Sequence, residues 1–101
     1  MIVSNNTIEI PRLHLLGVGS LETKALKHNV LLALQELGLN VILEEIEAFE
    51  RLMEYDISGI PALAVGEEVV LEKEIPSVDA LKDLLKPIFS PANNGNSAEE
   101  L

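Results

Sequence analysis

An amphipathic segment with clear start and stop signals, residues 21–37, most constrains what this chain can fold into. Ser20 is a typical helix N-cap, and Gly38 is a typical residue just beyond a helix end. Apolar runs on either side, at 13–16 and 39–43, indicate strands. The apolar face of the helix has the spacing i, i+4, i+7, i+8, i+11 and consists of Leu26, Val30, Ala33, Leu34 and Leu37. The sequence therefore predicts a strand–helix–strand unit with parallel strands, and the continuous apolar run in 39–43 is typical of a strand covered on both faces.

The second half of the chain predicts a short helix, a hairpin and a last helix. The short helix is marked by the spacing i, i+3, i+4 of Phe49, Leu52 and Met53. Strands at 62–65 and 69–72 are separated only by the turn 66–68, so we expect an antiparallel hairpin. Ser77 caps the last helix, whose inward face is Val78, Leu81, Leu84 and Leu85. The order β-α-β-α-β-β-α predicts an α/β fold with a mixed four-stranded sheet and helices on both faces.

Length and charge restrict the domain organisation and the classes of partner. With 101 residues the chain suits one domain, which we place at 12–89, after an arm or edge strand at 1–11 and before a disordered tail at 90–101. The formal net charge is −10, which repels phosphate backbones and anionic lipid surfaces. We therefore expect neither a nucleic acid nor a membrane as partner.

The chain contains no cysteine, which excludes disulfides, thiolate nucleophiles and thiolate-bound metals. The carboxylates of Glu44, Glu45, Glu47 and Glu50 cluster, but we interpret them as a solvated acidic edge, so we predict no metal and no cofactor. The N-terminus lacks the pattern of a signal peptide, and no apolar stretch approaches the ~20 residues of a membrane helix. We expect a cytoplasmic protein.

Four motifs carry a resemblance to a known family. They are Gly17-Val18-Gly19-Ser20-Leu21-Glu22-Thr23, Ile60-Pro61-Ala62-Leu63-Ala64-Val65, the following Gly66, and Pro76-Ser77. In these motifs and their spacing, the chain from about 13 to 86 resembles the small thioredoxin-like, glutaredoxin-like redox disulfide proteins of bacteria and archaea. The resemblance implies a thioredoxin-like fold in which Ser20 and Thr23 stand where the family has its two cysteines. It also implies a cis Pro61 beside them, and it places Lys73 where the family often has glycine.

Hydroxyls lack an accessible thiolate-like state, so dithiol–disulfide exchange is excluded and we assign no catalytic residue. Ser20 as a nucleophile would need a base. His28 lies eight residues along the same helix, about 12 Å away at ~1.5 Å rise per residue, and the side chain of His14 cannot be placed from the sequence. We predict a redox-inactive domain that binds a protein or peptide, and we keep as the alternative an enzyme acting on a small substrate. The expected groove consists of Gly19, Ser20, Thr23, Gly59, Ile60, Pro61 and Lys73.

Leu31 and Leu32 lie on opposite flanks of the core face of the first helix. One flank can be covered by the last helix, whereas the other has no obvious cover within the fold. We therefore expect a contact patch near these leucines, for another protein or for a second copy in a homodimer.

Overall fold

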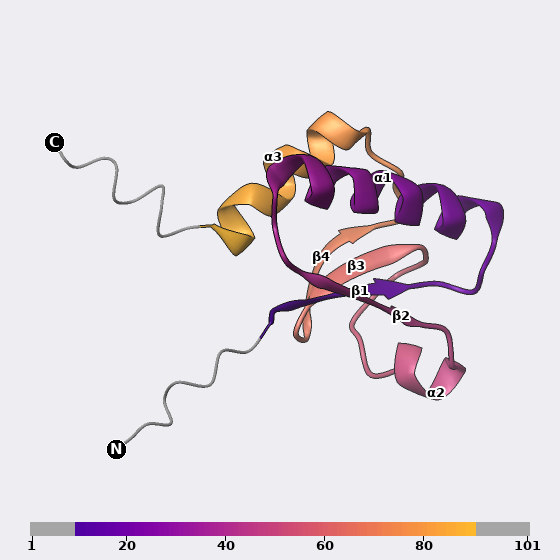
Figure 1. The fold of residues 1–101 in the computed structure, drawn as a ribbon. Coiled ribbons are helices and arrows are strands. Elements are labelled where there is room, and N and C mark those ends of the chain that lie inside the picture. Colours follow the sequence, from indigo (N-terminus) through magenta and orange to yellow (C-terminus); the bar gives the residue numbers. More distant parts are fainter. Residues whose placement is uncertain (1–9, 91–101) are drawn as a thin grey trace, which may run out of the picture.

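Strands and helices alternate along the chain in the order expected from the sequence (Figure 1). The computed structural model describes residues 10–90, so most of the expected arm and tail lies outside the described residues. The elements are β1 (Arg12–Leu16), α1 (Leu21–Leu37), β2 (Ile42–Ile46), α2 (Phe49–Leu52), β3 (Ala62–Val65), β4 (Glu68–Glu72) and α3 (Val78–Phe89).

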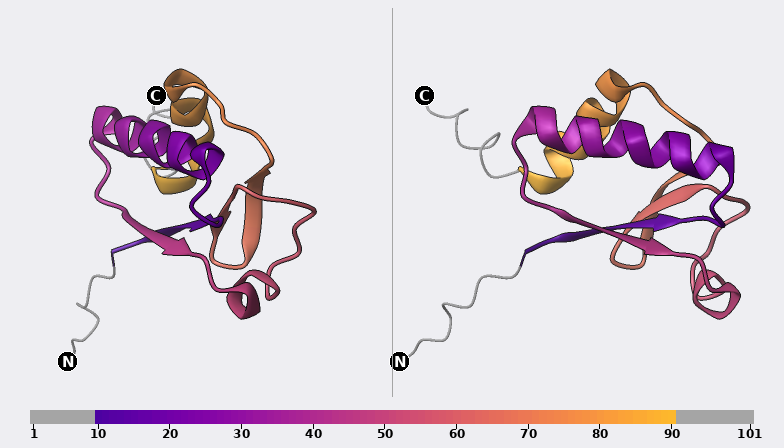
Figure 2. Two further views of the ribbon diagram at one scale, coloured as in Figure 1. Left: turned by 90° about the vertical axis from the view of Figure 1, so that its right-hand side faces the viewer. Right: turned by 45° about the vertical axis from the view of Figure 1, so that its right-hand side comes forward.

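The strands form one mixed sheet in the order β2-β1-β3-β4. β1 pairs with β2 in parallel, and the β1–β3 and β3–β4 pairs are antiparallel. The long helices α1 and α3 lie side by side on one face of the sheet, and the short α2 lies on the other (Figures 1 and 2). This arrangement confirms the α/β, thioredoxin-like fold class.

The position and environment expected for the second strand are wrong. β2 begins at Ile42 rather than at residue 39, because residues 39–41 are needed to leave the helix end and reach the register in which Ile42 pairs with Arg12. β2 also lies at an edge of the sheet instead of inside it. Glu44 and Glu45, two of the carboxylates that we interpret from the sequence as a solvated acidic edge, are therefore strand residues.

Both ends of α1 have the caps that the sequence predicts. The Ser20 hydroxyl accepts a hydrogen bond from the Thr23 backbone N–H at 3.2 Å. At the other end Gly38 adopts a left-handed conformation, with φ of 67°, and its N–H bonds to the Gln35 carbonyl. These caps satisfy backbone groups that a helix leaves unpaired at its ends, so local signals determine where α1 begins and ends.

The sheet separates a larger core from a smaller one. The larger lies under α1 and α3, and its buried members are Leu13, Leu15, Leu26, Val30, Ala33, Leu34, Leu63, Leu81 and Leu85. The smaller lies toward α2 and consists of Leu16, Ile46, Leu52, Ala62 and Ala64. Alternate residues of β1 point to opposite faces, so this one strand supplies leucines to both cores.

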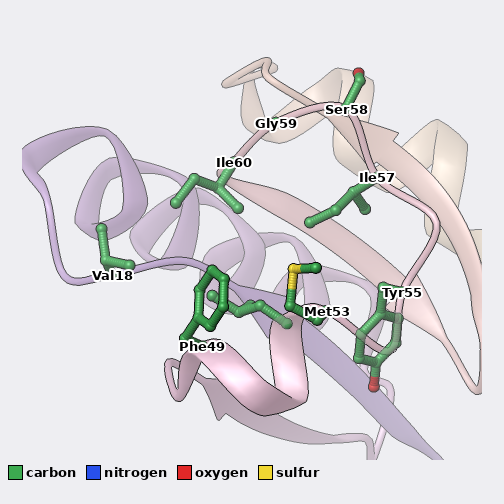
Figure 3. Close-up of a pocket in the computed structure, with 9 residues that line it drawn as sticks. Val18, Phe49, Met53, Tyr55, Ile57, Ser58, Gly59 and Ile60 are labelled. Carbon is green, nitrogen blue, oxygen red and sulfur yellow. The ribbon is translucent and has the colours of Figure 1, made fainter.

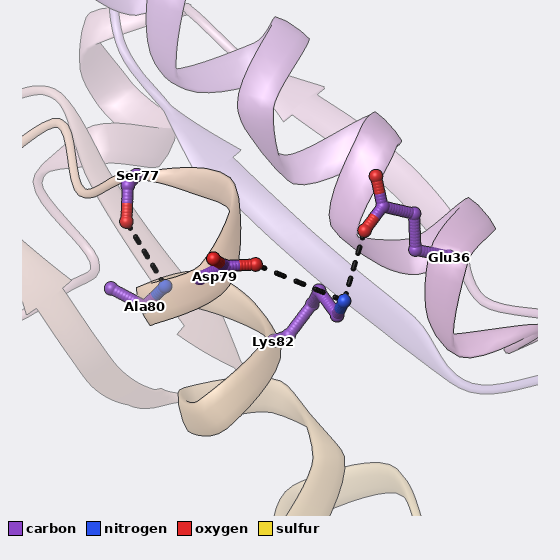
Figure 4. Close-up of polar contacts among 5 residues, drawn as sticks. All are labelled: Glu36, Ser77, Asp79, Ala80 and Lys82. Carbon is purple, nitrogen blue, oxygen red and sulfur yellow. Dashed lines mark hydrogen bonds and ion pairs between the residues drawn. The ribbon is translucent and has the colours of Figure 1, made fainter.

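One ion pair joins α3 to α1, and further polar contacts lie within the first turns of α3 (Figure 4). The Lys82 ammonium lies 2.9 Å from the Glu36 carboxylate, which raises the pKa of Lys82, and 3.8 Å from Asp79. The Ser77 hydroxyl caps α3 by accepting from the Ala80 N–H at 3.1 Å. These contacts are exposed, so the apolar surface between the helices supplies most of the stabilisation.

We predict that Leu63→Ala lowers the free energy of unfolding by about 2–5 kcal/mol, because Leu63 is fully buried on a central strand and its truncation leaves a cavity. The control is Leu31→Ala, which removes the same atoms from a side chain that is 45% exposed and should cost less than about 1 kcal/mol. Urea denaturation followed by circular dichroism measures both. Equal losses in the two variants would contradict the assignment of the core.

Candidate functional site

The turn between β1 and α1 is closed by two hydroxyl groups. Thr23 is buried, with 5% of its surface exposed, and its Oγ1 lies 3.1 Å from the Ser20 Oγ. A Cβ at Gly17 would overlap the Thr23 side chain, so the strand can approach the helix only with glycine there. Gly19 has φ of 79°, which glycine adopts without strain. Ser20 and Thr23 are therefore committed to the shape of this turn.

A second loop, residues 57–61, leads into β3. Its Ile60–Pro61 peptide bond is cis, as the resemblance implies. The Pro61 carbonyl accepts a hydrogen bond from the Lys73 N–H at 2.7 Å. A Cβ at Gly59 would overlap the Lys73 side chain, so the aliphatic part of that side chain lies against Gly59. Lys73 thus anchors the loop, with an unusual positive φ of 57° for a residue with a side chain.

Glu72 holds the same loop through Ser58. Its Oε1 accepts from the Ser58 backbone N–H at 2.7 Å and from the Ser58 hydroxyl at 2.8 Å. The backbone N–H first, and then the hydroxyl, stabilise the carboxylate and lower the pKa of Glu72 below its ordinary value of 4.5. Glu72, at the end of β4, and the next residue, Lys73, therefore hold the loop at Ser58 and at Pro61.

An apolar hollow of about 390 Å³ opens between these loops and α2 (Figure 3). Its lining residues come from the β1–α1 turn, from α2 and from the loop that follows, and they are Val18, Phe49, Leu52, Met53, Tyr55, Ile57, Ser58, Gly59 and Ile60. The side chains of Phe49, Met53 and Ile60 point toward a common space in Figure 3. Phe49 is 70% exposed and Met53 66%, so large apolar side chains here face water.

The hollow overlaps only in part with the groove expected from the sequence. Gly59 and Ile60 line it, whereas Lys73 lies against Gly59 and Ser20 and Thr23 contact each other. Gly19 and Pro61 belong to the two flanking segments and are likewise not among the lining residues.

Sequence reasoning missed the contribution of α2. The spacing of Phe49, Leu52 and Met53 indicates a helix, but only Leu52 is buried in the structure. The spacing puts the three side chains on one side of the helix, but only Leu52 reaches the smaller core, and Phe49 and Met53 stay exposed. An aromatic residue in a four-residue helix and a methionine at its C-cap are the signal that could have identified this surface.

The two leucines predicted as an interface differ in their surroundings. Leu32 is half-buried on the flank of Asn29, whose Nδ2 donates to the Pro76 carbonyl at 2.9 Å, so this flank faces the α3 side. Leu31 is exposed and lies one turn after Lys27, which pairs with Glu45 of β2. Leu31 is therefore the open one of the two, and an interface at this place stays a prediction.

The acidic run is partly neutralised within the protein. Glu44 lies within 4 Å of Arg12, Arg51 and the His14 Nε2. Across residues 10–90 no group of three or more His, Cys, Asp and Glu residues is placed to hold a metal ion. Within the same range, none of the helices is both long and apolar enough to cross a bilayer.

We predict that the Glu72 contact makes stability depend on pH in one direction. The pKa of Glu72 is lower in the folded than in the unfolded chain, so its contribution is complete above pH 4.5 and is lost as the pH falls through the folded-state value. The stability difference between wild type and Glu72→Gln should therefore shrink in acid. By NMR titration, Ser58→Ala should raise the pKa of Glu72 only in part, since the backbone N–H remains. A pKa of Glu72 unaffected by Ser58→Ala would contradict the hydroxyl's role.

We predict that Ser20→Cys/Thr23→Cys forms an intramolecular disulfide under mild oxidation. The two hydroxyl oxygens are already 3.1 Å apart, and a helix N-terminus stabilises a thiolate. Thiol titration and intact mass detect the bond. The control is Ser20→Cys alone, which has a single thiol, so its monomer cannot form an intramolecular disulfide. Wild type should not accelerate insulin reduction by dithiothreitol. Persistence of both thiols in the double variant would show that these are not the dithiol positions.

Comparison with known proteins agrees with this geometry. A family model described as a thioredoxin domain matches residues 12–86, from the start of β1 into α3. A thioredoxin of Methanothermobacter thermautotrophicus is 26% identical over 74 residues, which cover 73% of this chain and 96% of the relative. The residues matched by the family model include both loops that flank the hollow. The chain therefore belongs to the thioredoxin domain family, as a member that contains no cysteine.

Proposed function

We propose that this protein is a redox-inactive interaction module that binds a segment of another protein, or a peptide, in the apolar hollow beside α2. The observation that carries the proposal is the exposure of Phe49 and Met53 at the rim, together with Val18 at 57%. Scattered exposed apolar residues are ordinary, but here they come from two separate segments and converge on one hollow.

The energetics favour a partner at this place. Removing a large apolar side chain from water is worth about 1.5–3 kcal/mol, and Phe49 and Met53 forgo most of that in the free protein. A volume of about 390 Å³ is within the usual range of binding sites, and it suits one or two side chains of a partner. The methionine can adapt its shape to different apolar groups.

Binding accounts for the hydroxyls better than the alternative of an enzyme beside Ser20 and Pro61. Within residues 10–90 the hydrogen bonds of the Ser20 Oγ are to Thr23 alone, one accepted from its backbone N–H and one shared with its hydroxyl. A nucleophilic serine needs a base in hydrogen-bond reach. The contacts of Ser20 are those of a helix cap, so they support a role in shape rather than in chemistry.

We predict that peptides selected from a phage-displayed random library against the wild-type protein bind at the hollow. In ¹H–¹⁵N spectra, their addition should shift the amide signals of residues 18 and 49–60. Phe49→Ser/Met53→Ser should weaken binding at least about tenfold, because it removes most of the apolar rim.

The matched control is Ile42→Ser, which removes an exposed apolar side chain at the start of β2, outside the lining of the hollow, and should leave the affinity unchanged. Failure to select any peptide would contradict the proposal. So would selected peptides that bind Phe49→Ser/Met53→Ser as tightly as wild type.

A further inference from the structure

We propose that the segment bound in the hollow is apolar at its centre and basic at its flanks, an inference that rests on the proposed function. It follows from the charges around the hollow rather than from the apolar lining. Three carboxylates alternate with lining residues in the sequence, since Glu50 follows Phe49, Glu54 follows Met53 and Asp56 precedes Ile57. We call Glu50, Glu54 and Asp56 the acidic rim.

The acidic rim is exposed and has no cation of its own. All three residues are exposed, and among residues 10–90 none has an ion-pair partner within 4.0 Å. This differs from Glu44 and Glu45, which are paired with basic side chains across the sheet and on α1. The rim therefore carries charge that the fold does not use.

The basic residues that form ion pairs within residues 10–90 do not compensate that charge, because each pairs with another carboxylate. Arg51 lies in the same segment, but its guanidinium is directed to Glu44 at 3.9 Å. Lys73 lies against Gly59 and stands between Glu72 and Glu74 in the sequence. Lys27 of α1 is paired with Glu45 of β2, and Lys82 of α3 is paired with Glu36 of α1. The segment 49–57, which supplies most of the lining, therefore contains three carboxylates that have no ion pair among residues 10–90 and one arginine that is paired elsewhere, so its net charge is negative.

A basic-flanked apolar segment matches this surface in both respects. Its apolar centre fills the hollow, and the aliphatic stems of flanking lysines can cover Phe49 and Met53 while their ammonium groups reach the rim. Opposite charges also accelerate the encounter and disfavour acidic competitors, and both effects weaken in salt. An acidic or phosphorylated segment of the same apolar content would be repelled.

Three synthetic peptides test the inference. They share the centre Ser-Leu-Phe-Leu-Ser and carry Lys-Lys-Lys, Ser-Ser-Ser or Glu-Glu-Glu at both ends, and their affinities are measured by fluorescence anisotropy. In about 30 mM salt we expect the lysine peptide to bind at least about tenfold more tightly than the glutamate peptide, with the serine peptide between them. In about 500 mM salt the three affinities should converge, because the screening length is then only a few ångströms.

Two variants that neutralise the same number of carboxylates locate the effect. Glu50→Gln/Glu54→Gln/Asp56→Asn should weaken binding of the lysine peptide several-fold at low salt and leave the serine peptide unchanged. The control, Glu67→Gln/Glu68→Gln/Asp83→Asn, changes residues at the β3–β4 turn and on α3. It should preserve the preference for lysine, and circular dichroism verifies that both variants are folded.

The outcomes separate the two proposals. Equal binding of the three peptides, with contact at Phe49 and Met53, would overturn the basic-partner inference and leave the binding function standing. An equal loss in both charge variants would overturn the role of the acidic rim, since net charge alone would then explain the preference. Binding of none of the peptides at the hollow would overturn the inference outright, and the phage selection decides the binding function separately.

Discussion

Strand β1 holds the protein together, because it is hydrogen-bonded along both edges and supplies buried leucines to both faces of the sheet. Leu13 and Leu15 belong to the core under the long helices, and Leu16 belongs to the core toward α2. The strand then runs directly into the turn that Ser20 closes, where the Gly17 N–H bonds to the Ile46 carbonyl at 3.1 Å. The two sheet faces, the start of α1 and one wall of the hollow are thus positioned by a single stretch of chain.

The unequal cover of the two sheet faces explains where the hollow lies. Two helices of several turns cover one face, whereas the other receives α2, a helix of four residues, and the loop after it. That loop is held by the end of β4, through Ser58 and Pro61, rather than by an apolar core of its own. A short helix on a tethered loop leaves apolar side chains at the surface that a longer helix would bury. Phe49 and Met53 are exposed because so short a helix covers little of this face of the sheet.

Features with local causes could be predicted from the sequence, whereas features that depend on distant neighbours could not. Ser20, Gly38 and Ser77 act within a helical turn, so the bounds of α1 and the start of α3 were predictable. The register of β2 depends on Arg12 and Pro11, about thirty residues earlier in the chain. The apolar run at 39–43 therefore predicted a strand that begins three residues too early. Likewise the spacing of Phe49, Leu52 and Met53 indicates a helix but does not say how much sheet is available to cover it. The hollow therefore emerged only from the assembled fold.

The pair of hydroxyls at the start of α1 has one more consequence. In a dithiol pair of this fold the turn has two covalent states, and its conformation is linked to the reduction potential of the surroundings. Ser20 and Thr23 meet through a hydrogen bond that oxidants and reductants do not alter. The turn that contributes Val18 to the hollow therefore has no disulfide to form or to break. The dithiol step that would link this turn to the redox state of its surroundings is missing from this chain, because it has no cysteine.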